Sequence, residues 1–233
     1  MKPLIIIPAR KGSKGIPGKN MKSLGGKPLI KYSIDVAKSL FASDNICIST
    51  DSEDIISLAI KEGLKVPFVR PVTFCADNTS MHDVLIHAVN FYKDEGFDHD
   101  TIILLQPTSP FRTKENLEEA IRLYTSDTDM VVSVKKTDAN PYYVLYEENK
   151  DGFLRKSKSG NFSSRQECPE VWQFNGAIYI IKISELLKGS HLLFNRIVKY
   201  VMDDVSSLDI DSPLDWAFAE FCISNPTLSK IKI

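Results

Sequence analysis

Short β-branched runs alternate along the chain with longer stretches in which apolar residues recur at helical spacing. Residues 4–7 (L-I-I-I) form an apolar run that Pro8 stops, which is typical of a short buried strand. Similar runs predict further strands at residues 45–50, 66–69, 101–105 and 130–134. Helical spacing predicts helices at residues 28–40, 55–60, 80–95 and 114–124. This alternation predicts a mostly parallel sheet with right-handed crossovers.

The alternation breaks after Lys136. Residues 140–179 carry aromatics, turn residues and short β-like runs without a helical pattern. They predict an inserted arm at approximately residues 137–176, suited to dimer contacts, although an ordinary long surface excursion is an alternative. The strand and helix pattern resumes at residues 177–181, 183–187 and 198–202 and closes with a helix at 213–222. We therefore expect one α/β domain over residues 1–233, doubly wound and Rossmann-like, with a small β-rich dimerisation arm.

Length, charge and cysteine usage narrow the class of protein. A chain of 233 residues that is 43% hydrophobic can form one substantial α/β domain. The net charge of -1 gives no bulk attraction for nucleic acid, and the N-terminal apolar run is too short for a signal peptide or a membrane span. The four cysteines show no C-x-x-C pair, which favours free thiols over zinc or disulfides. We expect a cytoplasmic protein with no nucleic-acid or membrane partner.

The loop after the first strand, residues 8–20 (P-A-R-K-G-S-K-G-I-P-G-K-N), concentrates phosphate-binding groups. Its glycines let backbone N–H groups approach a ligand, and Ser13 adds a hydroxyl donor. Arg10 can grip phosphate oxygens through two N–H groups, while Lys14 and Lys19 act as compact charges. A solvated basic loop is the alternative. A position directly after a buried strand favours a polyphosphate ligand, because ligands of open α/β sheets bind beyond the carboxyl ends of strands.

The loop differs from better-known phosphate-binding motifs. Five residues separate Gly12 from Gly18, Asn20 follows Lys19 where a Walker loop needs Ser or Thr, and no G-x-G-x-x-G is present. The loop instead resembles the signature I-P-A-R-x-G-S-K-G-[IL]-P-x-K-N of the acylneuraminate cytidylyltransferases. The resemblance implies a nucleotidyltransferase fold and CTP as substrate.

A pair of carboxylates, Asp209 and Asp211, precedes the last predicted helix. Carboxylates at i and i+2 on an extended segment point the same way, so they can share one hard cation that also binds substrate phosphates, with Mg²⁺ expected. Alternatively, Asp211 caps the helix that Pro213 begins. The resemblance favours the metal, because that family uses a D-x-D before its last helix for this purpose.

The segment L-Q-P-T-S-P-F-R (residues 105–112) places Gln106 and Thr108 at the carboxyl edge of the sheet. Their amide and hydroxyl groups can hold sugar hydroxyls there. A strand-to-helix turn stiffened by two prolines is the alternative for this segment. The resemblance assigns the glutamine to the sugar.

Further nucleotide contacts are expected from a second segment. Arg70 ends a predicted strand, and the resemblance places the segment that follows it by the pyrimidine. Backbone groups near Ala9 and Ala76 and the Ser80 side chain are the candidates for recognising the base. Alternatively, Thr79 or Ser80 only caps the third helix.

The resemblance also extends to R-Q at residues 165–166 and F-N-G-A-I-Y at residues 174–179. It implies that Arg165 binds the carboxylate of the sugar or the phosphates and that Tyr179 packs on the sugar. A plain strand with an aromatic anchor is the alternative for Tyr179. The residues at 192–194 are L-L-F, where family members often place aromatics against an N-acyl group, so the sugar is left open among sialic, legionaminic and pseudaminic acids.

The resemblance runs in order over nearly the whole chain, and it implies an Mg²⁺-dependent transfer of CMP from CTP to a nine-carbon 2-keto sugar acid with release of pyrophosphate. The resemblance and the inserted arm together lead us to expect a homodimer. The residues expected to carry the transfer are Arg10, Lys14, Lys19 and Asp211, and those expected to bind the nucleotide are Ala9, Arg10, Ser13, Lys19, Asn20, Arg70 and Ser80. One alternative is an enzyme for the eight-carbon sugar of lipopolysaccharide, whose family tends to read P-A-R-x-x-S-x-R-[LF]-P-G-K-P. Another is a protein that binds a sugar nucleotide without turnover.

Overall fold

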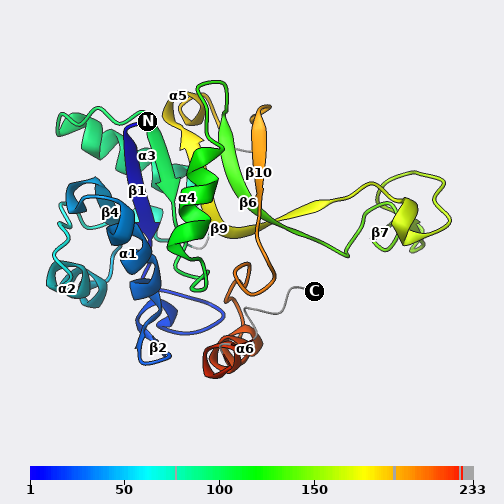
Figure 1. Ribbon diagram of the computed structural model, residues 1–233, viewed down its shortest axis with the longest axis horizontal. Helices are drawn as coiled ribbons and strands as arrows, with labels where there is room; N and C mark the ends of the chain where they lie inside the picture. The colour runs from blue at the N-terminus through cyan, green and yellow to red at the C-terminus, as the bar shows by residue number, and fades with distance from the viewer. Residues whose placement is uncertain (77, 191–192, 226, 228–233) are drawn as a thin grey trace.

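The computed structural model describes residues 1–233 except 77, 191–192, 226 and 228–233. Its centre is a six-stranded sheet (Figure 1). In sheet order, the strands are β10 (Ile197–Val201), β6 (Met130–Lys136), β9 (Trp172–Lys182), β5 (Thr101–Leu104), β1 (Pro3–Pro8) and β4 (Ile46–Ser49). Strand β9 runs antiparallel to both of its neighbours, and the other pairs are parallel. The predicted α/β fold with a mostly parallel sheet is confirmed.

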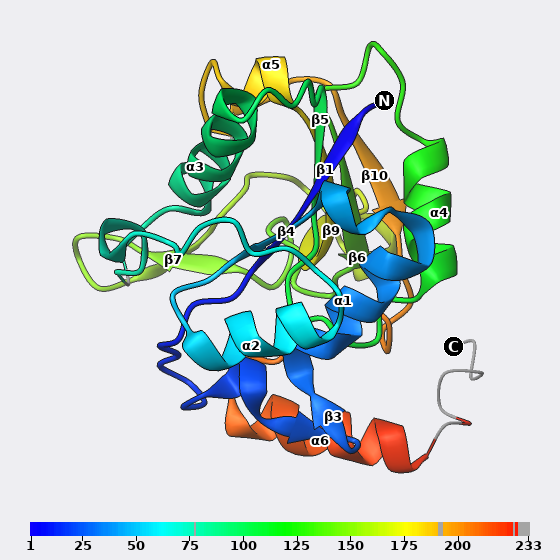
Figure 2. The same cartoon turned by 90° about the vertical axis from the view of Figure 1, so that its left-hand side faces the viewer.

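Helices cover both faces of the sheet, as Figure 2 shows for α3 and α4. One face packs against α1 (Leu29–Leu40), α2 (Glu53–Lys61) and α4 (Lys114–Arg122). The other face packs against α3 (Met81–Asp94) and α5 (Ile183–Leu186). Alternate residues of β1 enter opposite cores, Ile5 and Ile7 on one side and Leu4 and Ile6 on the other. Burial on both faces explains the uninterrupted apolar run of this strand.

A third, smaller core joins the two ends of the chain below the sheet. It contains Ile16 of the glycine-rich loop, Leu24 of the short strand β2 (Ser23–Leu24), Ile210, and Trp216 of the last helix α6 (Pro213–Ser224). Strand β2 pairs with β3 (Lys27–Pro28), and both figures place α6 beside this pair. The loop and the D-x-D segment are therefore packed together although they lie near opposite ends of the chain.

The strand predicted at residues 66–69 is absent, which corrects that expectation. These described residues are irregular, and the next residue, Arg70, donates its N–H to the Thr50 carbonyl (2.7 Å). Pro67 has no N–H to donate to a ladder, and Val69 is 61% exposed. A proline in the middle of a short apolar run prevents this stretch from extending the sheet beyond β4.

The segment predicted as an arm projects sideways from the sheet (Figure 1). It leaves β6 after Lys136 and returns at Trp172, which pairs with Lys136, so we call residues 137–171 the arm. Strand β9 thus begins inside the range predicted for the arm. The arm carries a hairpin of β7 (Tyr146–Glu148) and β8 (Leu154–Lys156).

Among the described residues, no helix has both the length and the apolar character needed to cross a membrane.

Candidate active site

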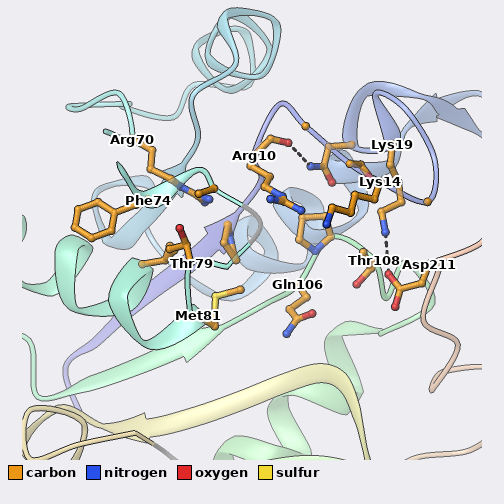
Figure 3. Close-up of a pocket in the computed structure, with 18 residues that line it drawn as sticks. Arg10, Lys14, Lys19, Arg70, Phe74, Thr79, Met81, Gln106, Thr108 and Asp211 are labelled. Atoms are coloured by element: carbon orange, nitrogen blue, oxygen red, sulfur yellow. Dashed lines mark hydrogen bonds and ion pairs between the residues drawn. The ribbon is translucent and has the colours of Figure 1, made fainter. Parts of the chain in front are cut away.

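A cavity of about 490 Å³ opens at the carboxyl ends of β1 and β5 (Figure 3). Four segments meet in it: the glycine-rich loop, the stretch from Arg70 to Val84, the turn after β5, and Asp211. The cavity lies where open α/β sheets bind ligands. The predicted site residues that line it are Arg10, Ser13, Lys14, Lys19, Asn20, Arg70, Gln106, Thr108 and Asp211.

Lys19 and Asp211 join the two ends of the chain in this cavity. The Lys19 Nζ donates to the Ile210 carbonyl (2.6 Å) and to Asp211 Oδ1 (3.0 Å), as Figure 3 shows for Asp211. The Lys19 side chain is 9% exposed, whereas that of Asp211 is 74% exposed. The buried ammonium is therefore fixed by these two acceptors, and the carboxylate remains accessible from the cavity.

Two glycines of the loop occupy positions where a side chain would be strained or would clash. Gly18 adopts a positive φ of 63° where the 3-10 turn Lys19–Met21 begins, a conformation that L side chains rarely adopt. At Gly15, an added Cβ would lie 2.0 Å from the Asp211 carbonyl oxygen. The loop approaches the D-x-D backbone more closely than any side chain would allow.

A hydrogen bond joins Arg10, near the start of the loop, to Asn20 at its end. The Arg10 Nη1 donates to the Cys75 carbonyl (3.3 Å), and the Asn20 Nδ2 donates to the Arg10 carbonyl (3.1 Å). Ser13 and Lys14 line the same cavity. Asn20 therefore fixes the backbone that presents Arg10, in addition to lining the cavity itself.

Arg70 and Ala9 are anchored to the end of β4. The buried Arg70 donates from Nε to Ser49 Oγ (3.0 Å) and from Nη2 to the Ser49 carbonyl, and burial lowers the pKa of its guanidinium. The Ala9 N–H bonds the same carbonyl (2.9 Å), and Ala9 is 1% exposed. Arg70 thus forms part of the cavity wall while its donors stabilise the strand end, and Ala9 lies behind that wall.

Ser80 caps α3 and does not line the cavity. Its exposed Oγ accepts from the Asp83 N–H (3.2 Å) and donates to Asp83 Oδ2 (2.7 Å). The neighbouring Thr79 lines the cavity instead. The structure therefore favours the capping alternative for Ser80.

Asp211 does not cap α6, so the capping alternative for this residue is wrong. The cap is Ser212, whose Oγ accepts from the Asp215 N–H (3.3 Å) while Asp215 Oδ2 accepts from the Ser212 N–H (2.7 Å). Asp215 Oδ2 also accepts from the Asp211 N–H (3.1 Å). The Asp211 carboxylate is left facing the cavity.

Asp209 is the more buried of the two carboxylates. It lines a second cavity of about 380 Å³, together with residues that include Asn175 and Phe174. Burial raises the pKa of Asp209, the nearby Thr108 hydroxyl opposes this shift, and the charge of Asp211 adds to it. Its Oδ1 and the Thr108 Oγ1 are buried without a hydrogen-bond partner among the described residues. A buried carboxylate oxygen with unmet bonding capacity fits a hard cation, whose charge would favour the ionised form.

Arg165 and Tyr179 lie away from the main cavity. Arg165 begins a short 3-10 turn of the arm and pairs there with Asp138. Tyr179 lies on β9 with its ring edge-on to Phe174 (centroids 6.2 Å apart), and burial raises the pKa of its hydroxyl. The cavity of this chain alone therefore does not bring Arg165 to the other predicted residues.

Apolar residues of the cavity are the ones that reasoning from sequence missed. Phe74, Met81 and Val84 line it opposite the cationic loop, as Figure 3 shows for Phe74 and Met81. In the sequence they look like ordinary core positions of a loop and a helix. One signal in the sequence could have identified them: Phe74 closely follows the R-P segment, and Met81 and Val84 lie in the first turn of α3.

Comparisons with known proteins agree with this geometry. The sequence model of the family described as cytidylyltransferase matches residues 4–194. The chain is 34% identical over 230 residues to the post-translational flagellin modification protein B of Campylobacter coli, covering 97% of this chain and 96% of that protein. It is 34% identical over 231 residues to the CMP-N,N'-diacetyllegionaminic acid synthase of Campylobacter jejuni, covering 97% of each. With the N-acylneuraminate cytidylyltransferase of Streptococcus agalactiae serotype III it shares 33% identity over 219 residues, covering 93% of this chain and 52% of that protein.

The fold also has solved counterparts. A CMP:2-keto-3-deoxy-manno-octonic acid synthetase complexed with CTP superimposes with a TM-score of 0.70 and covers 97% of this chain and 100% of that one. The sequence identity is 18%, so this likeness concerns the fold alone.

Proposed function

The chain belongs to the cytidylyltransferase family, and on that premise we propose that it transfers CMP from CTP to the anomeric hydroxyl of a nonulosonic acid and releases pyrophosphate. The relatives that match nearly the whole chain include one named for making a CMP-nonulosonic acid. The observation that carries the proposal is the contact of Lys19 with Asp211, which brings a phosphate-binding cation and a metal-binding carboxylate into one cavity. The sugar belongs to the group that includes sialic, legionaminic and pseudaminic acids.

The glycine-rich loop would bind the triphosphate. Arg10 and Lys14 line the cavity, Ser13 adds a hydroxyl, and Lys19 lies at its rear. Phosphoryl transfer of this kind depends mainly on positioning and on neutralising charge in the transition state. These side chains would hold the α-phosphorus in line between the attacking sugar oxygen and the departing pyrophosphate.

The nucleoside would lie across the loop toward α3. Phe74 and Met81 offer an apolar surface for the pyrimidine, and Asn20 would orient the ribose or a phosphate. Arg70 and the backbone near Ala9 would shape the wall behind it. Ser80 would act through the start of α3, because its hydroxyl is bonded to Asp83.

Asp209 and Asp211 would hold Mg²⁺. When bound, the ion supplies positive charge to the phosphates. No group of three or more acidic, histidine or cysteine side chains suited to a metal occurs among the described residues, so the protein would supply two carboxylates and the substrate and water the remaining ligands. An accessible Asp211 beside a buried Asp209 with an unpartnered oxygen supports this assignment.

The sugar would occupy the space between the turn after β5 and strand β9. Gln106 and Thr108 would bond its hydroxyls, and Tyr179 would pack beside it. Its carboxylate requires a cation, and we assign Arg165 to it. Since Arg165 lies on the arm, outside the cavity of its own chain, we propose a homodimer in which the arm contributes Arg165 to the sugar site of the partner.

The four free thiols are consistent with a cytoplasmic location.

The proposal is tested by measuring pyrophosphate release with CTP, Mg²⁺ and a panel of sialic, legionaminic, pseudaminic and 3-deoxy-manno-octulosonic acids. We expect turnover with at least one nine-carbon acid and none without CTP or metal. Turnover with the eight-carbon acid alone would assign the chain to the other branch of the family. Binding of CTP without turnover on any sugar would indicate a sugar-nucleotide-binding protein.

A further inference from the structure

Arg112 is a buried cation to which the proposed mechanism assigns no task. It lies between β5 and α4 and is 2% exposed. It makes no salt bridge to a carboxylate in the part of the chain that the structure describes, and its Nε has no hydrogen-bond partner there. Burial lowers its pKa to about 9, so the guanidinium stays protonated at pH 7. A buried charge without a counter-ion is costly, and an apolar side chain of similar size would fill the space with less penalty.

The guanidinium joins three segments that are distant in sequence. Its Nη1 donates to the carbonyls of Ala177 on β9 (2.6 Å) and of Gln106 at the end of β5 (3.3 Å). Its Nη2 donates to the Oγ of Ser33 on α1 (2.6 Å), and that Oγ donates to the same Gln106 carbonyl (3.2 Å). The backbone of Gln106 is thus held from behind by two donors.

The hydrogen bonds of Arg112 to Gln106 and Ala177 flank Gly176, beside which two proposed site residues lie. Gly176 precedes Ala177 and has a φ of 77°. A Cβ built on Gly176 would lie 3.5 Å from Gln106 Oε1 and 3.5 Å from Asp209 Oδ2. The Gln106 amide and the Asp209 carboxylate therefore both lie beside Gly176. Arg112 bonds the main chain of Gln106 and of Ala177, the residue after Gly176.

We propose that Arg112 is a positioning residue for the acceptor sugar, because its bonds to Gln106 and Ala177 set the gap between the Gln106 amide and the Asp209 carboxylate. The inference rests on the proposed function, in which Gln106 binds the sugar and Asp209 the metal. Arg112 touches neither substrate. Its loss widens or tilts the acceptor side of the site and leaves the phosphate-binding loop in place, since its hydrogen bonds go to Gln106, Ala177 and Ser33.

The test is the conservative variant Arg112→Lys in the full-length protein. A lysine keeps the charge but presents one nitrogen, which cannot reproduce the two-pronged geometry of the guanidinium. We expect the KM for the sugar to rise about tenfold or more, because a misplacement of ~1 Å can cost as much as 100-fold in rate. The Kd for CTP, measured by titration calorimetry, should stay within about twofold, since the loop is untouched.

Two further variants separate positioning from stability. Ser33→Ala keeps Arg112 and removes the hydroxyl that it shares with Gln106, so the KM for the sugar should rise in the same direction by a smaller factor. Leu117→Ala destabilises α4 through a buried side chain that makes none of these bonds, and it should lower Tm with an unchanged KM. If Arg112→Lys fails to fold, the sugar KM of Ser33→Ala alone tests the proposal, and an unchanged value overturns it.

The outcomes also separate this inference from the proposed function. An active wild type in which Arg112→Lys leaves the sugar KM unchanged, or weakens CTP and sugar by the same factor, overturns the inference alone. A wild type that binds CTP but releases no pyrophosphate with any sugar overturns the proposed function and this inference with it.

Discussion

The Lys19 ammonium is one charge with two acceptors, and both come from the segment that carries the D-x-D. It bonds the Ile210 carbonyl and the Asp211 carboxylate, 191 and 192 residues further along the chain. The carbonyl contact fixes the backbone between the two aspartates, and the carboxylate contact orients Asp211. Because Lys19 is buried and Asp211 is exposed, a cation arriving from the cavity meets the carboxylate first.

At this scale we expect Asp211→Asn to abolish most of the turnover while the fold survives. The amide keeps the size of the side chain and an acceptor for Lys19 but removes the charge that would hold Mg²⁺. The kcat/KM should fall by about 10²–10³-fold, the loss typical for removal of one electrostatic contact to the transition state. Since the side chain is 74% exposed, Tm should change little. Pyrophosphate release at several Mg²⁺ concentrations measures the effect.

The matched control is Asp98→Asn. Asp98 is also an exposed carboxylate in an ion pair, with Lys2, but it does not line the main cavity. Its variant should keep full activity. Near-normal turnover of Asp211→Asn at limiting Mg²⁺ would remove Asp211 from the metal site.

Single residues also mark the limit of what the sequence could predict about the site. Arg10 and Lys19 were predictable as cavity residues because their loop directly follows a buried strand, and Asp211 because the resemblance favoured a metal ligand over a helix cap. Met81 was not, since an apolar side chain at a helix start reads as core. Arg112 could not be understood either, because its role depends on contacts with residues that meet it only in the folded chain.

The element that determines the geometry of the site is the loop packed against the D-x-D segment. Ile16 and Ile210 share the small third core, and Gly15 lies against the Asp211 carbonyl. An ion pair alone would not hold two chain ends in register, whereas packed apolar residues next to it do. The loop and the D-x-D segment are therefore packed as one unit.

Gly15→Ala should separate that unit. The new Cβ would stand 2.0 Å from a backbone oxygen, so the main chain must shift. Overpacking of this kind costs about 1–3 kcal/mol, and we expect the KM for CTP to rise about tenfold or more because the phosphate donors move away from Asp211. Steady-state kinetics and thermal unfolding of the variant measure both effects.

Gly12→Ala is the control within the same loop. Gly12 also lines the cavity, but a Cβ there meets nothing within 4 Å. It should bind CTP nearly as well as the wild type. An equal rise in the KM for CTP in both variants would mean that CTP binding depends on general loop flexibility and not on the contact with Asp211.

A second element-scale prediction concerns how the edge strand β10 is held. The Asp129 carboxylate at the start of β6 accepts from the Arg196 N–H (2.9 Å), from Arg196 Nε (3.0 Å) and Nη2 (2.7 Å), and from the Asn195 N–H (3.3 Å). Hydrogen bonds from the Arg196 backbone and then its side chain lower the pKa of Asp129. The carboxylate therefore stabilises the folded state only while it is ionised.

Because the folded pKa is the lower one, this stabilisation is present above the unfolded value of about 3.9 and is lost as pH falls through the folded pKa. Asp129→Asn should thus have a lower Tm than the wild type at pH 7, and the difference should disappear in strong acid. Thermal unfolding from neutral pH down to about pH 2.5 checks this. The exposed neighbour Asp127→Asn serves as the comparison, and a difference that stays constant with pH would contradict the assignment.

Elements were largely predictable where apolar periodicity and caps agreed. The helices that became α3 and α4 follow their patterns closely. The expected strand at residues 66–69 failed because β-propensity was counted without the missing donor of Pro67. The reversed direction of β9 was not predictable either, since it follows from the arm returning to the edge of β6 that it left.

For the whole molecule, the arm is the feature that a single chain does not explain. Its hairpin exposes Phe153 and Leu154, each 67% accessible, and it carries Arg165 away from the cavity. Exposed apolar side chains on a projecting hairpin are typical of an interface. A symmetric dimer would cover them and could bring each Arg165 to the sugar site of the other chain.

This arrangement predicts complementation between two inactive variants. Arg165→Ala should lose use of the sugar while still binding CTP, and Asp211→Asn should lose turnover while keeping its arm. Dimers mixed in equal amounts and allowed to exchange would be about half heterodimers, each with one intact site, so about a quarter of wild-type activity should return. Light scattering first establishes the dimer, and pyrophosphate release before and after exchange measures the recovery.

Neither variant can recover activity by itself, so any return must come from sites built by two chains. If exchange is verified by mass-tagged subunits and no activity returns, Arg165 does not act across the interface. If Arg165→Ala alone keeps a normal KM for the sugar, Arg165 has no part in binding it. The second result would leave the phosphate and metal assignments standing, because both depend on residues that meet within one chain.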